Sequence, residues 1–275
     1  MGNTRALVVL TPYESRRVIA KAVARLPAVE NAMQNGWIIV STGTSTGYVA
    51  EELLGEPMVK ENFISGHITA GETWDTPKNP NYIFPVVFHK GKRQSMIPED
   101  ALKEFTADDV FVKGANAVDP QYRAAVFAAS GTGGTMGWSM GTVLARGAHL
   151  VMPVGLEKLI ADVPAVAKHA GNRSFKYAMG STIGMVPVVT ATVVTEIQAF
   201  EQLFGIEAYH AGAGGIAGSE GAIVLILEGE DAKVAKAFEF AKSIKGEKPL
   251  NRPYGIPVQA GVEKPLSAKA GASGA

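Results

Sequence analysis

The chain has 275 residues, 47% of them hydrophobic, and its 26 Lys and Arg residues balance 26 Asp and Glu residues, which gives a formal net charge of zero. This balance excludes the strongly basic surface typical of nucleic-acid binding, and the absence of cysteine excludes disulfides, thiol nucleophiles and cysteine-ligated metal centres. The longest apolar stretches, such as residues 185–194, are far shorter than the roughly 20 residues that span a bilayer, so we expect a cytoplasmic protein without a membrane or targeting segment.

Strand-like and helix-like segments alternate over the first two thirds of the chain. Short apolar runs predict strands at residues 5–10, 37–41, 82–88, 109–113 and 150–154. Helical spacing or turn signals predict helices at residues 13–26, 48–54 and 156–169, with shorter or less regular ones starting at Pro98 and after the glycine-rich turn 130–134. Alternation of this kind predicts an α/β main domain, residues 1–185, built on a mostly parallel, Rossmann-like sheet.

The pattern changes after residue 185. Strands are expected at residues 187–195, 206–210 and 222–227, and helices at residues 196–204 and 231–244. The order β-α-β-β-α is most of a ferredoxin-like (split βαβ) unit, which we place at residues 186–250. Residues 251–275 are expected to be a C-terminal extension or tail, because their apolar content is low from about residue 262.

Two glycine-rich loops, at residues 42–47 and 130–135, stand between an apolar segment and a helix. Glycine allows tight backbone turns, hydroxyl groups supply hydrogen bonds, and free N–H groups at a helix start favour a bound anion. A capped helix start or a tight crossover without a ligand explains each loop equally well. We expect the two loops side by side at the carboxyl edge of one parallel sheet. The candidate ligand-binding residues are Thr42, Gly43, Thr44, Ser45, Thr46, Gly47, Ser130, Gly131, Thr132, Gly133, Gly134 and Thr135.

Five segments, taken in order, carry a family resemblance: residues 36–47, 109–119, 131–134, 149–159 and 187–229. Together they resemble A-type ribose-5-phosphate isomerases and, more loosely, the glucosamine-6-phosphate deaminase and coenzyme A transferase superfamily. The resemblance implies a phosphate loop at residues 42–47, a ligand-facing Asn116 and a ferredoxin-like unit used for oligomerisation.

The chain also departs from this family. The resemblance implies a glutamate general base just after the second loop, yet residues 124–145 contain no ionisable side chain. Proton transfer needs a titratable group within reach, so we expect no ribose 5-phosphate isomerisation by that mechanism. In the segment 109–119, Asn116 and Ala117 stand where the family has acids, and only Asp119 remains.

Other residues are candidates for catalysis. Asp119 and Lys113 lie near the end of a predicted strand, where ligands bind in open parallel sheets, although a surface salt bridge explains Lys113 equally well. His67, Glu72 and Asp75 lie within nine residues and offer a metal site or an acid–base pair. A solvated loop whose polar side chains satisfy turns is the favoured interpretation of that segment.

The sequence leaves three functions open. The first is a divergent sugar-phosphate isomerase-like enzyme that binds a phosphorylated or other anionic small metabolite at loops 42–47 and 130–135. The second is a non-catalytic ligand-binding or sensor protein, and the third is an acyl or coenzyme A transferase-like enzyme. No cofactor, metal, nucleic acid or membrane partner is indicated. Nearly continuous apolar strands in the second unit predict a homo-oligomer, either a dimer or a tetramer.

Overall fold

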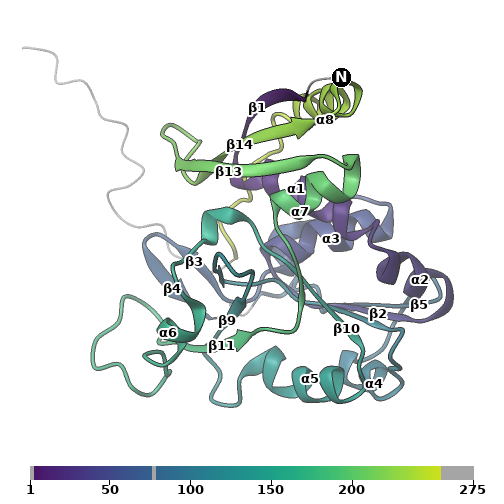
Figure 1. Cartoon of the computed structure of the whole chain (residues 1–275). Coiled ribbons are helices and arrows are strands. Elements are labelled where there is room, and N and C mark those ends of the chain that lie inside the picture. Colours follow the sequence, from purple (N-terminus) through teal and green to yellow (C-terminus); the bar gives the residue numbers. More distant parts are fainter. Residues whose placement is uncertain (1–2, 76–78, 255–275) are drawn as a thin grey trace, which may run out of the picture.

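The computed structural model describes residues 3–75 and 79–254, so the tail expected from residue 262 lies outside the described residues. A six-stranded sheet lies at the centre of the main body (Figure 1). Its strands are, in spatial order, β12 (Thr192–Val194), β10 (His149–Pro153), β7 (Val110–Val112), β2 (Trp37–Val40), β5 (Val86–His89) and β6 (Lys92–Gln94). The first four strands run parallel, and β5 and β6 are antiparallel to their neighbours. The chain is therefore mixed α/β.

Helices cover both faces of this sheet. One face packs on α1 (Pro12–Val23), α2 (Pro27–Asn35) and α3 (Thr44–Leu54), and the other on α4 (Pro98–Lys103) and α5 (Gly134–Ala145). Side chains alternate along β2, so Ile38 and Val40 join the first core while Ile39 joins the second. Among the described residues, none of the helices has the length and apolar character needed to cross a bilayer.

Two smaller sheets and several short turns lie beside the carboxyl edge of the parallel strands. One contains β8 (Ala117–Val118), β9 (Ala124–Ala128) and β11 (Gly184–Val188), and the other is the hairpin of β3 (His67–Thr69) and β4 (Glu72–Trp74). The short helical turns are η1 (Lys60–Phe63), η2 (Leu156–Lys158) and α6 (Val163–Ala167). The helix expected at residues 156–169 is wrong: Asp162 caps α6, and Pro164 is tolerated in its first turn but not inside a longer helix.

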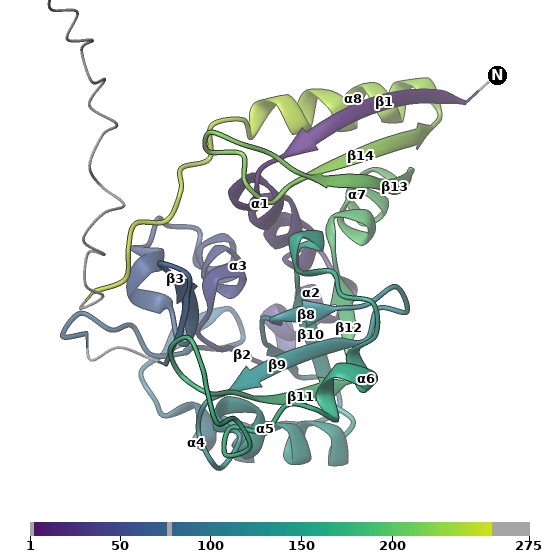
Figure 2. The same ribbon diagram turned by 90° about the vertical axis from the view of Figure 1, so that its left-hand side faces the viewer.

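The remaining sheet joins the two ends of the described chain (Figure 2). It consists of β1 (Thr4–Leu10), β14 (Ala222–Gly229) and β13 (Glu207–Gly214), all antiparallel, and α7 (Glu196–Phe204) and α8 (Asp231–Ser243) pack on it. The strand expected at residues 187–195 is wrong. The chain bends at residues 189–191, so β11 pairs with β9 whereas β12 pairs with β10, and the third strand of the small sheet is β1.

One face of this small sheet packs on helices and the other is open. Val8 and Leu10 of β1 are buried in the core shared with α1 and α8, whereas Leu7 and Val9 are 63% and 44% exposed. Leu7 pairs with the half-buried Ile226, which pairs in turn with the exposed Tyr209 of β13. Contiguous exposed apolar groups on a sheet are uncommon in monomers.

We predict that two copies of the chain associate through this open face. Light scattering of the unmodified protein should give a multiple of 28.9 kDa, and Leu7→Lys should shift the mass toward the monomer because a charge would enter an apolar interface. Val59→Lys changes another exposed apolar residue and serves as the control. A monomeric mass for the unmodified protein at micromolar concentration would contradict the prediction.

A buried carboxyl group joins the small sheet's helices to the main body. Glu196, the first residue of α7, is fully buried, and its carboxylate accepts a hydrogen bond of 2.9 Å from the backbone N–H of Leu156. Burial, together with the neighbouring charge of Glu157, raises the pKa of Glu196 to about 7. Glu157 is itself only 3.5 Å from Arg16, which offsets part of that charge.

The raised pKa makes stability depend on pH. The folded state keeps the Glu196 proton at pH values where the unfolded chain has lost it, so the free energy of unfolding should fall as pH rises from about 4.5 through 7. Glu196→Gln should therefore be more stable than the unmodified protein at pH 8, by on the order of 2 kcal/mol, and nearly equal to it at pH 5. Urea unfolding at both pH values measures this difference. Glu201→Gln, on the same helix but exposed, should show no such pH dependence.

Candidate functional site

A cavity of about 180 Å³ lies where the loops after β2, β7 and β9 converge with the β3–β4 hairpin and η2. The parallel ladder places these strand ends at one level: the N–H of Ser41 donates to Val112 O at 2.9 Å, and that of Lys113 donates to Val151 O at 3.0 Å. Its polar lining residues are Thr42, Thr44, Ser45, Ser65, His67, Thr73, Asp75, Lys113, Asn116, Ser130, Thr135 and Lys158. The carboxyl edge of the sheet is the usual ligand position in folds of this kind.

The first glycine-rich loop contributes its first four residues to the cavity. Thr42, Gly43, Thr44 and Ser45 line it, and Thr44 begins α3, so the first N–H groups of that helix have no intrahelical partner. The last two residues do not line it: the hydroxyl of Thr46 donates to Gly43 O at 3.2 Å, and Gly47 packs near Lys60 and Phe63. The loop therefore places the start of α3 against the cavity.

The second loop reaches the same cavity from a different sheet. Ser130, Gly133, Gly134 and Thr135 line it, whereas Gly131 and Thr132 do not. Gly133 has φ of 82°, a left-handed conformation that glycine adopts without strain, and it leads directly into α5. The expectation of one parallel sheet is wrong for this loop, because it follows β9, which pairs antiparallel with β8 and β11.

Two lysine side chains supply the positive charge of the cavity. Lys113 directly follows β7, and Lys158 lies in η2 after β10. The ammonium group of Lys158 donates to Ala115 O at 2.9 Å. Loss of solvent, together with the charge of Lys158, lowers the pKa of Lys113 to about 8, and loss of solvent also lowers the pKa of Lys158.

Several polar atoms at the cavity have no hydrogen-bond partner among the described residues. Nε2 of His67 and the hydroxyl of Ser45 are both buried and unpartnered, although buried polar groups are normally paired. His67 Nδ1 lies 3.0 Å from the hydroxyl of Thr69, and burial lowers the pKa of His67, so its imidazole is neutral at pH 7. Both side chains therefore keep a hydrogen-bonding capacity that none of the described residues uses.

Of the remaining predicted residues, some line the cavity and others lie away from it. Asp75 lines the cavity, but Glu72 of the same hairpin does not, and among the described residues no group of three His, Asp or Glu side chains is arranged to hold a metal ion. Asn116 lines the cavity while its Oδ1 accepts a hydrogen bond from Phe127 N–H at 3.0 Å. Asp119 is buried away from the cavity lining, where it pairs with Arg123 at 2.6 Å.

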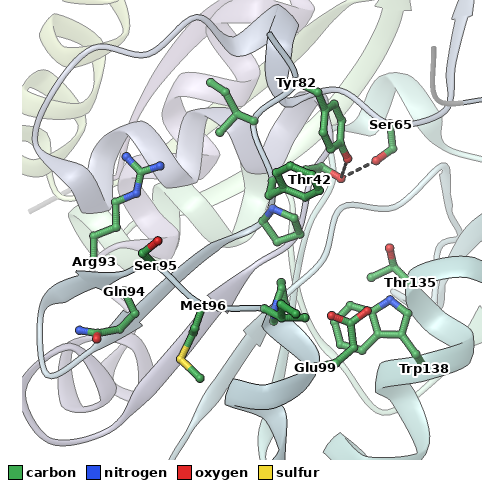
Figure 3. Close-up of a pocket in the computed structure, with 15 residues that line it drawn as sticks. Thr42, Ser65, Tyr82, Arg93, Gln94, Ser95, Met96, Glu99, Thr135 and Trp138 are labelled. Atoms are coloured by element: carbon green, nitrogen blue, oxygen red, sulfur yellow. Dashed lines mark hydrogen bonds between the residues drawn. The ribbon is translucent and has the colours of Figure 1, made fainter. Parts of the chain in front are cut away.

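A wider groove of about 1,140 Å³ adjoins the cavity and shares Thr42, Ser65 and Thr135 with it. Figure 3 shows Thr42 at this boundary, hydrogen-bonded to Ser65 and to the hydroxyl of Tyr82, which donates to Thr42 Oγ1 at 3.2 Å. The groove is partly apolar: Phe84 and Ile97 are 72% and 62% exposed, and Arg93, Gln94 and Trp138 also line it. A ligand held in the cavity has room to extend along this groove.

Sequence reasoning missed Lys158 as a site residue. The signal for it was present, because residues 156–158 directly follow a predicted strand and therefore lie at the carboxyl edge of the sheet. The strand expected at residues 82–88 begins only at Val86, and the preceding residues 82–85 line the groove instead.

Comparison of the chain with protein-family models, with curated proteins and with solved structures gave no match. The function is therefore inferred from the geometry of the cavity.

The contacts of Asp119 predict a structural role. Its carboxylate accepts backbone hydrogen bonds from Gln121, Arg123 and Val163 and pairs with the Arg123 side chain; burial opposes its ionisation, but these contacts outweigh burial and lower the pKa of Asp119. Asp119→Asn should lower the free energy of unfolding by about 2 kcal/mol at pH 7, because the buried carboxylate loses its charge-assisted hydrogen bonds to the backbone and to the partly exposed Arg123. Chemical unfolding measures the loss, with the exposed Asp108→Asn as the control. Stability equal to that of the control would show that the contacts of Asp119 contribute little to the fold.

Proposed function

We propose that the cavity binds a phosphorylated or other anionic small metabolite and that the protein is an enzyme acting on it. The observation that carries this proposal is the pairing of two lysines with unpartnered hydroxyl and imidazole groups at one enclosed site. The N-termini of α3 and α5 add backbone N–H groups and the positive ends of two helix dipoles. Asp75 is the lone carboxylate among the described lining residues, so the net charge of the lining favours an anion.

The size of the cavity favours a small ligand. A volume of about 180 Å³ is below the roughly 300–1,000 Å³ of pockets for drug-sized molecules. A phosphate or carboxylate group with a short carbon chain fits this space, and any larger part of the ligand would lie in the adjoining groove. The proposal agrees with the resemblance to sugar-phosphate isomerases, in which a Rossmann-like domain with a ferredoxin-like unit holds the substrate.

Catalysis is favoured over simple binding by the state of the titratable groups. A site that only binds an anion gains most from lysines that stay fully protonated, yet the lowered pKa of Lys113 and the neutral imidazole of His67 leave both groups able to transfer protons near neutral pH. A non-catalytic sensor remains the second candidate. The family resemblance implies a glutamate base just after the second loop, but α5, which follows that loop, contributes no acid or base among the described lining residues. An acyl or coenzyme A transferase would need a carboxylate nucleophile, for which Asp75 is the remaining candidate.

Binding of inorganic phosphate tests the proposed site. Calorimetry should show saturable binding that weakens with added salt, and Lys158→Met should weaken it roughly tenfold or more, because a charge-assisted hydrogen bond to the anion is lost. Lys168→Met removes a lysine that is exposed on the surface and should bind phosphate as the unmodified protein does. Thermal unfolding of each variant checks that the fold is kept.

The same calorimetry with ribose 5-phosphate and with small carboxylates compares ligand classes, and a coupled assay tests isomerisation of ribose 5-phosphate, which we expect to be absent. If no phosphorylated or carboxylated compound binds, the proposed function is wrong. If ligands bind equally well to Lys158→Met, the anion site lies elsewhere.

A further inference from the structure

Lys113 lines the cavity, and the sheet holds its backbone in place. Its backbone N–H is held by Val151 O, and it is the first residue after β7, one of the central strands of the parallel sheet. Strand-end residues of this kind are placed by the sheet itself and therefore vary little in position. The following residue is Gly114, which has no side chain to fill the space beside the lysine.

The Lys113 side chain has no acidic partner among the described residues, unlike the enclosed cations Arg17 and Lys60. Arg17 contacts three carboxylates at 2.5–2.9 Å, those of Glu51, Glu52 and Glu247, and Lys60 contacts Glu51 at 2.7 Å. The charged group that acts on Lys113 is instead a second cation, Lys158. Nothing in this arrangement holds the proton on the Lys113 nitrogen.

We propose that Lys113 is a nucleophilic amine that forms an imine with the carbonyl carbon of an anionic aldehyde or ketone bound in the cavity. This inference rests on the proposed function, since the anionic group must be held by Lys158 and the helix starts for the carbonyl to reach the amine. It narrows the substrate class to carbonyl compounds that carry a phosphate or a carboxylate, such as phosphorylated sugars and 2-oxo acids.

The chemistry needs a neutral amine. With a pKa of about 8, about one Lys113 in ten carries the free amine at pH 7, against about one in 2,500 for a lysine with its ordinary pKa. Desolvation and a neighbouring cation are the two environments that activate lysines for imine formation. Lys113 has both.

The reaction balances with water as the leaving group. The nitrogen lone pair of Lys113 attacks the carbonyl carbon, and one proton passes from the nitrogen to the oxygen to give a carbinolamine. The hydroxyl group then takes up a second proton, the C–O bond breaks, and water leaves as the nitrogen lone pair forms the C=N bond; loss of the second nitrogen proton gives the neutral imine. His67 is suited to carry these protons: when its Nδ1–H donates to the hydroxyl of Thr69, the unpartnered Nε2 keeps a free lone pair that can take up a proton from the nitrogen and return it to the oxygen.

Reductive trapping tests the inference with the full chain. The protein is incubated with glyceraldehyde 3-phosphate or with pyruvate in the presence of cyanoborohydride, and adducts are located by peptide mass spectrometry. We expect modification at Lys113 many times faster than at the exposed Lys168, suppression by inorganic phosphate, and a rate that rises with pH to half its maximum near pH 8. Lys113→Met should abolish the fast adduct, whereas Lys168→Met should keep it; thermal unfolding confirms that both variants are folded.

The outcomes separate the two proposals. If phosphate binds but Lys113 reacts no faster than Lys168 with every carbonyl probe, the imine is wrong and the anion site stands. If Lys113 reacts fast but phosphate neither binds nor protects it, the reactive amine stands and the proposed anion site is wrong. If neither binding nor fast modification occurs, both proposals are wrong.

Discussion

The hydrogen-bond ladder of the short parallel strands is the constraint on which the rest of the structure depends. Each of β2, β7 and β10 ends where a neighbouring strand accepts or donates the next backbone hydrogen bond, as in the bonds from Ser41 to Val112 and from Lys113 to Val151. Because parallel strands end at the same edge, three loops from distant parts of the chain meet there, and side-chain contacts such as that of Lys158 with Ala115 O add to the strand pairing. The cavity is a consequence of strand pairing, and its chemistry follows from the residues that each strand end carries.

The distribution of charge follows from this arrangement. Elsewhere the fold neutralises enclosed cations with carboxylates, most completely around Arg17, which bridges α1 to Glu51 and Glu52 of α3 and to Glu247. At the strand ends the cations Lys113 and Lys158 both line the cavity, and the charge of Lys158 acts on Lys113; a bound anion would lower the electrostatic cost of placing them there. If the cavity binds an anion as we propose, the site is less favourable when empty than when occupied, and the two lysines then serve binding more than stability.

Local sequence signals predicted the elements that depend on local physics. The helix at Glu196–Phe204 has a capping box at its start and glycine after its end, and the strand Trp37–Val40 is an unbroken apolar run. One error was local, because Pro164 is not tolerated inside the helix expected at residues 156–169. The errors in strand bounds and sheet order came from pairing, which no local signal encodes. Residues 187–195 have the composition of one strand, but whether they continue or bend depends on β9 and β10, which lie far away in the chain.

In the candidate site, too, local sequence signals predicted some features and long-range contacts decided the others. Glycine-rich loops and a strand-end lysine could be recognised from spacing, so Thr42, Thr44, Lys113 and Gly133 were anticipated as neighbours of a ligand. Asp119 was a candidate because it is an acid near a strand end, yet its direction is set by a turn that closes on Arg123 and by the backbone of Val163. These contacts determine whether a side chain at a strand end faces the cavity or the interior of the fold.

The pairing of β1 with β14 has a consequence for how the chain reaches its fold. Arg5 and Glu228 form an ion pair across this ladder although they are 223 positions apart in the sequence. During synthesis from the N-terminus, β1 therefore emerges long before its partner strand exists, and its apolar residues stay unpaired until nearly the whole described chain has been made. Such non-local pairing raises the loop-closure entropy and slows folding. The small sheet is thus the last part that a growing chain can complete, and until then β1 presents an open edge to other chains.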